Sequence, residues 1–558
     1  MNCMPDSVLG AQRHAWVLLC WGYLTWALHG APPELNHWYP AGAQAGITLE
    51  VSSVGKSDPW PPQVWCSSPD VTFNPLETAN LWQVQIAEQA HPGPVLVRLY
   101  NASGASSARW FLIQQSKTVQ EEEPNNAPME ANPAPMGSMI HGRLRERQDV
   151  DTYALALRAN TTLIARMDAY VLGSTVDPLM RLLNRQMQPV AINHDSYYLD
   201  PFIAYDVTVT DTYYLQCMGF PYPANASEQL GSGEGYIYQV YVTDGPYLRT
   251  ADWPEGRHPQ TMILDGWNLD SPTTQRTMGL STPWVDFPTA AQADLINAKG
   301  LATEEEPNDD SDHATRISAG SRGSLQSQQD VDWFRWTASK GTHYSVSIQS
   351  SRLGFQGDLL LKLFDQEDKE ILSNDDGIGT VDPMLDWLAP DTAEYQWRLS
   401  SRTQPSGTSL PYRLLITPME PSCRLSLESE IIDLKPGDSK VMTITIERSY
   451  GHHSALMLEA IGIPAGVSMT SSLIPAEAKE AKIVFHATPS SQPHQGPLRL
   501  MARESDNRWR TFPIGRKTIT TSVNNGVPNG YLDQVLVSID DLWISLLPAT
   551  DQMSDSTE

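Results

Sequence analysis

Two stretches of the sequence, Glu121 to Asn126 (EEEPNN) and Glu304 to Asp309 (EEEPND), are nearly identical acidic boxes that end in proline and asparagine. Each box is followed by a second acidic motif, Asp149-Val150-Asp151 in the first case and Asp330-Val331-Asp332 in the second. Self-similarity at a long period is the mark of a repeated structural unit. The boxes therefore predict two copies of one domain.

The spacing after the boxes supports the duplication. Asp151 and Asp177 are 26 residues apart, and so are Asp332 and Asp358. A further 16 residues lead from Asp177 to Asn193 and from Asp358 to Asn374. Chance would not hold this register, so the two copies are expected to share their strands as well as their boxes.

Apolar residues alternate with polar ones within both copies, as in Tyr153, Leu155 and Leu157. A period of two predicts half-buried strands, and the Gly, Pro, Asn and Asp between the runs predict turns. We expect each copy to be a small antiparallel β-sandwich and the fold class to be all-β. A chain of 558 residues is too long for one core, and about three to five domains are expected.

The predicted organisation is a string of β modules. Immunoglobulin-like modules are expected on either side of the repeats, and the connection between the repeats reads equally well as a linker or as a truncated β module. The predicted boundaries are 1–30 for a signal peptide, 31–118 for the first immunoglobulin-like module, 119–245 for the first repeat, 246–303 for the connection, 304–420 for the second repeat, 421–525 for the second immunoglobulin-like sandwich and 526–558 for a C-terminal segment with a polar tail.

The N-terminus predicts export. Arg13 and His14 precede an apolar run from Ala15 to Leu28, and small residues follow it, which is the order found in signal peptides. The run is shorter than the roughly 20 residues of a membrane span. Lys and Arg number 38 against 65 Asp and Glu, a net charge of −27, which disfavours nucleic acid as a partner. We expect a periplasmic, cell-surface or extracellular protein.

The acidic box has the chemistry of a calcium site. In an extended segment Glu304 and Glu306 project to the same side, with Asn308 two residues further on. Asp332 lies in line with the apolar Phe334, so its carboxylate is expected at the edge of the core, where it needs a partner. Calcium binds six to eight such oxygens. The alternative is that the Asp residues cap turns and that the Glu run is a solvated linker.

The Glu-x-Glu-Pro-Asn-Asp box, the Asp-x-Asp-aromatic strand start and the late Asn374-Asp375-Asp376 together resemble the pre-peptidase C-terminal domain of secreted bacterial proteins, a family related to the collagen-binding modules of bacterial collagenases. The resemblance implies calcium held between the box and the loop before the aromatic strand. The ligands that it implies are Glu304, Glu306, Asn308, Asp309, Asp330 and Asp332 in the second copy, and Glu121, Glu123, Asn125, Asp149 and Asp151 in the first.

The first copy departs from the family pattern at two positions. Asn126 stands where the family has Asp, and His194 stands where the second copy has Asp375. Both changes remove negative charge, so the second copy is predicted to bind calcium more strongly.

No catalytic motif was found. The sequence lacks His-Glu-x-x-His, a Gly-x-Ser-x-Gly elbow and a phosphate-binding glycine loop. The expected function is therefore that of a secreted, non-catalytic calcium-binding protein that binds an extracellular polysaccharide or an envelope protein. The alternative is an accessory subunit or targeting module of a secreted hydrolase whose catalytic site lies on another chain.

Overall fold

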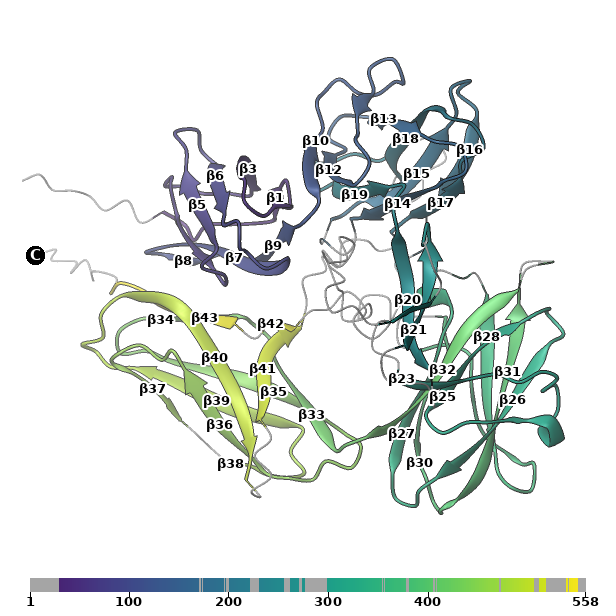
Figure 1. Cartoon of the computed structure of the whole chain (residues 1–558). Helices are drawn as coiled ribbons and strands as arrows, with labels where there is room; N and C mark the ends of the chain where they lie inside the picture. The colour runs from purple at the N-terminus through teal and green to yellow at the C-terminus, as the bar shows by residue number, and fades with distance from the viewer. Residues whose placement is uncertain are drawn as a thin grey trace, which may run out of the picture.

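The computed structural model describes residues 30–549 except 170–171, 173, 195, 197–199, 221–229, 255–260, 270–272, 276–298, 354, 356, 378–380, 405–406, 408, 471–472, 506–510, 518–537 and 540. The predicted signal peptide and the polar tail from residue 550 lie outside these residues. In the described part the chain is built of strands, with two short 3-10 turns and no α-helix (Figure 1). The all-β prediction is confirmed.

The first module is a sandwich of two sheets. One sheet has the order β1-β3-β6-β5 and the other the order β2-β9-β7-β4, with β8 paired to β7. Trp38, Trp82 and Phe111 fill the space between them. The strands are β1 His37–Tyr39, β2 Gly42–Gln44, β3 Thr48–Val54, β4 Gln63–Cys66, β5 Val71–Pro75, β6 Leu81–Ile86, β7 Gly93–Asn101, β8 Gly104–Ala105 and β9 Arg109–Gln114.

The first repeat is a second sandwich, with sheet orders β10-β12-β19-β14-β17 and β11-β13-β18-β15-β16. Its core lies between these sheets and includes Tyr153, Leu155 and Leu157, the residues whose alternation predicted a strand. The strands are β10 Lys117–Gln120, β11 Asn132–Pro133, β12 Ser138–Arg143, β13 Asp151–Leu157, β14 Thr162–Asp168, β15 Asp177–Leu183, β16 Pro189–Asn193, β17 Phe202–Asp206, β18 Asp211–Phe220 and β19 Ile237–Thr243.

The second repeat has the same topology strand for strand. Its sheets contain β23-β25-β32-β27-β30 and β24-β26-β31-β28-β29, which correspond in order to those of the first repeat. The elements are β23 Lys299–Thr303, η2 Ser311–His313, β24 Thr315–Arg316, β25 Gly320–Leu325, β26 Val331–Ala338, β27 His343–Gln349, η3 Ser351–Leu353, β28 Asp358–Phe364, β29 Glu370–Asn374, β30 Met384–Leu388, β31 Ala393–Thr403 and β32 Leu410–Met419.

The described part of the connection between the repeats forms strands that contact both neighbours. β20 (Tyr247–Pro254), β21 (Thr261–Trp267) and β22 (Thr273–Gln275) are antiparallel, and β20 pairs in parallel with β23, which extends the second repeat's sheet to eight strands. At its other end, Tyr247 and Trp267 pack against the first repeat. The segment is thus a sheet extension that bridges the repeats.

The last module is a single apolar core wrapped by an eleven-stranded sheet of antiparallel and parallel pairs. Phe485 and Trp543 are its largest fully buried aromatic side chains. The strands are β33 Ser422–Leu427, β34 Ile431–Leu434, β35 Ser439–Ser449, β36 Leu456–Ile461, β37 Val467–Thr470, β38 Leu473–Ile474, β39 Glu480–Ala487, β40 His494–Glu504, β41 Thr511–Lys517, β42 Ser538–Ile539 and β43 Asp541–Leu546.

The first and last modules contact each other, so the chain closes on itself (Figure 1). Arg98 is fully buried and lies 3.3 Å from Glu430 Oε2, while the backbone N–H of Ala108 donates to the other carboxylate oxygen at 3.3 Å. The ring of Trp543 lies against Trp65, with centroids 5.9 Å apart. A buried ion pair between residues 332 positions apart in the sequence, with aromatic rings beside it, therefore joins the first and last modules.

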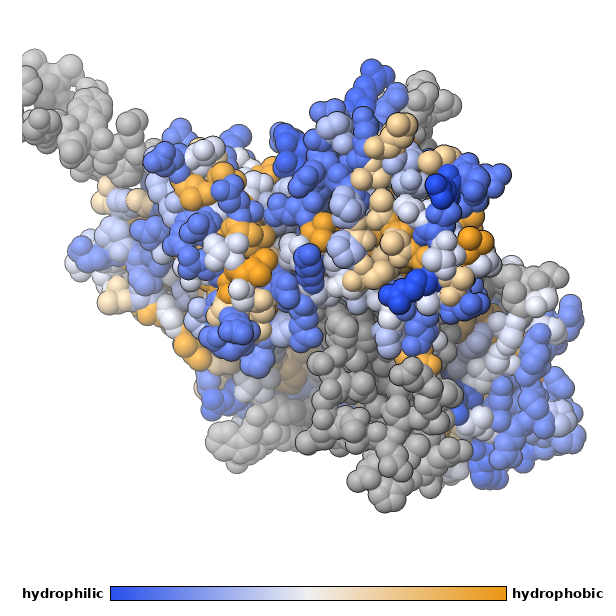
Figure 2. Space-filling view, turned by 45° about the horizontal axis from the view of Figure 1, so that its top comes forward, coloured by the Kyte–Doolittle hydropathy of each residue, from blue (hydrophilic) through white to orange (hydrophobic). Residues whose placement is uncertain are grey.

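The surface of the visible face is mostly hydrophilic, with separate apolar patches (Figure 2). Among the described residues no helix is long and apolar enough to cross a membrane. Cys66, Cys217 and Cys423 are all free thiols.

The closure can be tested on Arg98 and Glu430. Replacing either residue alone with Ala leaves the other charge buried and unpaired, which costs about 3–5 kcal/mol. We expect Arg98→Ala and Glu430→Ala to separate the two modules, seen as a larger radius of gyration in small-angle X-ray scattering. The control is Arg424→Ala, which removes an exposed ion pair with Glu447. An unchanged radius in both single variants would contradict the role of this contact.

Candidate metal centre

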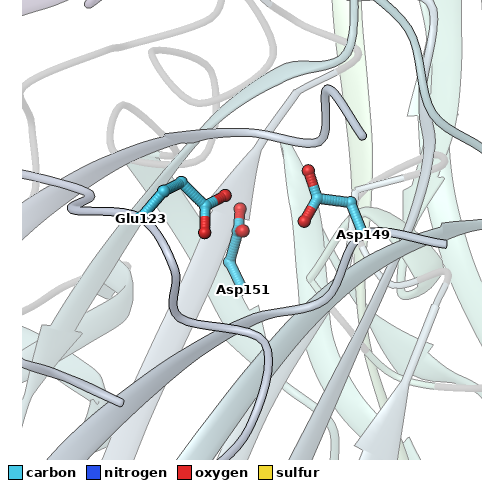
Figure 3. A group of neighbouring side chains, drawn as sticks. All are labelled: Glu123, Asp149 and Asp151. Atoms are coloured by element: carbon cyan, nitrogen blue, oxygen red, sulfur yellow. The ribbon is translucent and has the colours of Figure 1, made fainter. Parts of the chain in front are cut away.

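Each repeat gathers three carboxylates at the end of its sandwich. Glu123, Asp149 and Asp151 form the group in the first repeat (Figure 3), and the second repeat places equivalent residues together. Within each group, one oxygen of every carboxylate lies within 4.8 Å of the others. Oxygens bound to one calcium ion at 2.3–2.6 Å are at most about 5 Å apart. Each triad could therefore hold a metal ion. The triad of the second repeat consists of Glu306, Asp330 and Asp332.

The inner carboxylate of each triad is fully buried. Asp151 opens β13 and Asp332 is the second residue of β26, each in line with the core aromatic two positions later. A tyrosine from the neighbouring sheet donates its hydroxyl to each carboxylate, Tyr238 to Asp151 and Tyr412 to Asp332. The strand alternation that buries the aromatic side chain therefore buries the carboxylate as well.

A glutamate from the start of the box stands behind each buried aspartate. Glu304 Oε2 lies 2.6 Å from the Tyr412 hydroxyl, which also contacts Asp332. A hydroxyl has one hydrogen and can donate to only one of two carboxylates at a time. The two acids can therefore stay this close only when a proton or a cation offsets one of their charges.

Glycine is required beside this pair. A Cβ atom at Gly323 would collide with the Glu304 carboxylate and the Tyr412 hydroxyl, and one at Gly142 would collide with the Tyr238 hydroxyl. The backbone of β12 and β25 thus approaches the acids closely, and the N–H of Ser324 donates to Glu304 Oε1 at 2.7 Å.

Burial makes the charged form of these acids unfavourable. It raises the pKa of Asp332 to about 9, with the charge of Glu304 adding to the effect, and it raises the pKa of Glu121 to about 7. Burial also places the pKa of Asp151 well above its usual range, again with a contribution from the neighbouring glutamate. At neutral pH the cluster would hold protons in place of a cation.

The outer aspartates differ between the repeats. In the first, Asp149 Oδ2 accepts the N–H groups of Arg145 and Glu146, but the buried Oδ1 has no hydrogen-bond partner among the described residues. In the second, Asp330 Oδ1 accepts the N–H of Val331 at 2.8 Å. An orphaned carboxylate oxygen is costly to bury, and a cation would satisfy it. The oxygens of the first triad therefore fit a hard metal ion.

The asparagines of the boxes hold the box in place. Asn125 and Asn308 are fully buried. Their backbone carbonyl groups accept the backbone N–H of Thr152 and Trp333 respectively. They fasten each box to the strand that carries the buried aspartate. Asp309 is exposed beside Asp330, and Asn126, its counterpart in the first repeat, accepts the N–H of Val150 at 3.1 Å.

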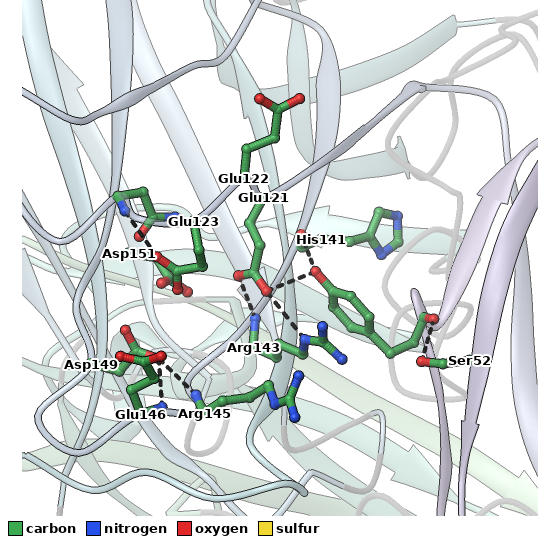
Figure 4. Close-up of polar contacts among 12 residues, drawn as sticks. Ser52, Glu121, Glu122, Glu123, His141, Arg143, Arg145, Glu146, Asp149 and Asp151 are labelled. Atoms are coloured by element: carbon green, nitrogen blue, oxygen red, sulfur yellow. Dashed lines mark hydrogen bonds and ion pairs between the residues drawn. The ribbon is translucent and has the colours of Figure 1, made fainter. Parts of the chain in front are cut away.

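The first centre lies at a junction between modules (Figure 4). Glu121 Oε1 accepts the hydroxyl of Tyr39 from the first module at 2.9 Å, and the Arg143 guanidinium lies 4.2 Å from the centre of the Tyr39 ring. Arg143 also pairs with Glu121 at 3.5 Å. Ser324 stands at the corresponding position in the second repeat, so the second centre lacks a counterpart of Arg143.

Three of the predicted ligands in each repeat, the triad residues, are brought together. Glu121 and Glu304 lie behind the triads. Asn125 and Asn308 bond the backbone of the box to the neighbouring strand. The late acidic loop is separate: Asp375 pairs with Arg402 on β31, and His194 packs against Phe220. Sequence reasoning missed Tyr238 and Tyr412, although both copies have a tyrosine opposite the glycine of β12 and β25.

No family model matches the chain, and no curated protein matches it. Solved structures with some similarity include the fibronectin(III)-like modules of Clostridium thermocellum CbhA, at 11% identity over 44% of this chain and 93% of that chain, with a TM-score of 0.13. The N-terminal four Ig domains of Dscam1 isoform 4.4 match at 9% identity over 93% of this chain and 98% of that chain, with a TM-score of 0.18.

The raised pKa values predict how stability depends on pH when no metal is present. An acid whose pKa rises from about 4 in the unfolded chain to about 7 (Glu121) or about 9 (Asp332) stabilises the fold fully below pH 4, and that stability is lost as the pH rises through the folded pKa. For protein kept free of metal by a chelator, we expect the melting temperature to fall by several degrees as the pH rises from 5 to 8. Asp332→Asn should flatten this slope, whereas Asp433→Asn on the exposed face of β34 should not.

Proposed function

We propose that the chain is an exported, non-catalytic protein that binds calcium at two equivalent centres and uses its tandem β modules to bind an extracellular polymer or an envelope protein. The observation that carries the proposal is that both repeats place a triad of carboxylates, two of them buried, at the same position of the same sandwich. A cluster of buried acids is destabilising without a cation, and here the arrangement occurs twice.

Calcium fits these centres better than other common metals. Every triad ligand is a carboxylate oxygen, and neither triad includes histidine or cysteine, the ligands that favour zinc or copper. Each triad also joins a loop to a strand, and calcium accepts the irregular geometry of such a frame, whereas magnesium demands a near-ideal octahedron.

Glu123, Asp149 and Asp151 would hold the ion in the first repeat, and Glu306, Asp330 and Asp332 in the second. When bound, calcium supplies positive charge that offsets the clustered carboxylates. The chain itself supplies the positioning. Glu123 and Glu306 each accept the backbone N–H of the asparagine two residues later, at 2.9 and 3.0 Å, which holds the carboxylate against its own box.

A binding role is favoured over catalysis by the architecture and the sequence. The acids are duplicated, as expected for two structural ions, whereas the paired carboxylates of a glycosidase would not normally occur twice. The sequence also lacks the metalloprotease and serine-hydrolase motifs sought above. The leader-like N-terminus supports export. Outside the cytoplasm calcium is plentiful, and extended modular proteins there contact polymers and envelope proteins.

Calcium titration of the full chain tests the proposal. We expect calcium to raise the melting temperature of chelator-treated protein, because an ion at a hundred times its Kd stabilises the folded state by about 2.7 kcal/mol per site. Isothermal titration calorimetry should give two sites for the wild type and one each for Asp151→Asn and Asp332→Asn. Asp433→Asn is the matched control and should keep both.

The two single variants also rank the centres. The nearby Arg143 lowers the negative charge of the first centre and so weakens its affinity for calcium. The buried Asp149 oxygen without a hydrogen-bond partner strengthens that affinity. The second centre binds calcium more strongly if the effect of Arg143 is the larger of the two. Asp151→Asn, which retains the second centre, should then show the lower Kd. Two wild-type sites that persist in both variants would refute the ligand assignment.

A further inference from the structure

The second repeat presents an exposed sheet face that the first repeat lacks. Phe334 and Trp336 of β26 point into the core, so the alternating residues Trp333 and Arg335 point outward from the sheet β24-β26-β31-β28-β29. These strands lie at the outer side of the molecule (Figure 1). The middle of this face consists of Trp333, Arg335, Lys362, Phe364, Gln396 and Arg398, all half-buried.

Two aromatic rings form the apolar part of this face. Trp333 on β26 and Phe364 on β28 have ring centroids 5.1 Å apart at an interplanar angle of 39°, so they meet over the intervening strand β31. Neither ring enters the core of the sandwich. Half-exposed tryptophan beside arginine is the composition that dominates binding energy at interfaces.

Three cations flank the rings. The strand register places Arg398 between Trp333 and Lys362. Arg335 donates to the Ser311 carbonyl at 2.6 Å, and Lys362 pairs with Glu370 at 2.7 Å on the edge strand β29. The Arg398 side chain makes no hydrogen bond or ion pair within the described part of the chain, so its guanidinium is available for a ligand.

The equivalent face of the first repeat is satisfied internally. Thr152, Gln216 and Arg181 occupy the positions of Trp333, Arg398 and Lys362. Gln216 accepts from Arg181 at 3.0 and 2.7 Å and donates to Thr152 at 3.3 Å. The two repeats therefore share their cores and acidic triads but differ in this face, which in the second repeat carries aromatic rings and an unpaired guanidinium.

We propose that this face of the second repeat binds an anionic polysaccharide, a linear chain of sugar rings that carries carboxylate groups. The inference rests on the proposed function, since it names a polymer class and a site for it. The flat aromatic pair offers an apolar platform for the face of a sugar ring, and the Arg398 guanidinium has the planar fork that binds a carboxylate through two hydrogen bonds.

Charge complementarity decides between anionic and neutral polymers. The chain has a net charge of −27, and two acids, Glu370 and Glu394, lie at the margins of this face. They are paired with Lys362 and Arg316, which leaves Arg335 and Arg398 without an acidic partner among the described residues. At physiological ionic strength charges more than about 8 Å apart are largely screened, so a ligand at this face responds mainly to the local cations. A neutral glycan carries no charge that these cations could attract.

The test is affinity electrophoresis of the full chain through gels that contain hyaluronate, with dextran as the neutral polymer and chitosan as the cationic one. We expect hyaluronate alone to retard the wild type, and retardation to weaken as salt is added. Trp333→Ala and Arg398→Gln should each weaken binding at least tenfold. Thr152→Ala and Arg181→Gln, at the matching positions of the first repeat, should leave it unchanged.

Circular dichroism and melting temperature, measured for every variant, separate loss of binding from loss of fold. Hyaluronate binding that survives in folded Trp333→Ala and Arg398→Gln would overturn the site and leave the proposed function standing. Equal retardation by dextran would overturn the anionic specificity. No retardation by any of the three polymers would count against both the site and polymer binding.

Discussion

Asp151 and Asp332 are charged groups buried at the point where a core strand begins, and the surrounding structure is arranged to tolerate them. In each repeat a tyrosine from the opposite sheet donates to the carboxylate, a glycine lets the neighbouring strand approach, and the acidic box closes over the outside. The stability of each sandwich therefore depends on this cluster.

The two centres transmit this dependence differently. In the first repeat Glu121 extends the cluster to Tyr39, so the acids are part of the junction with the preceding module. In the second repeat the Glu304 carboxylate bonds Tyr412 and Ser324, which both belong to its own sandwich. Both copies of the domain thus keep the same acidic cluster. In the first copy the cluster contacts the preceding module, and in the second its contacts lie within one module. The outer sheet face also differs between the copies.

Much of the fold was predictable, because strands with a period of two and repeated motifs are local signals. The gathering of Glu306, Asp330 and Asp332 also followed from short motifs near one another in the sequence. The tyrosine partners did not, since Tyr412 meets Asp332 across 80 residues and only the sheet register brings them together. The ion pair between Arg98 and Glu430 was equally hidden, because neither residue differs locally from a surface charge.

The contact between the first and last modules also sets how the molecule responds to force. Modules joined only end to end would be stretched in series by tension between the two termini. Here the described chain starts in one of the touching modules and ends in the other, so a pull on the ends first loads the interface around Arg98 and Trp543. The sandwiches between them, with their buried acids, are shielded from tension until that interface yields.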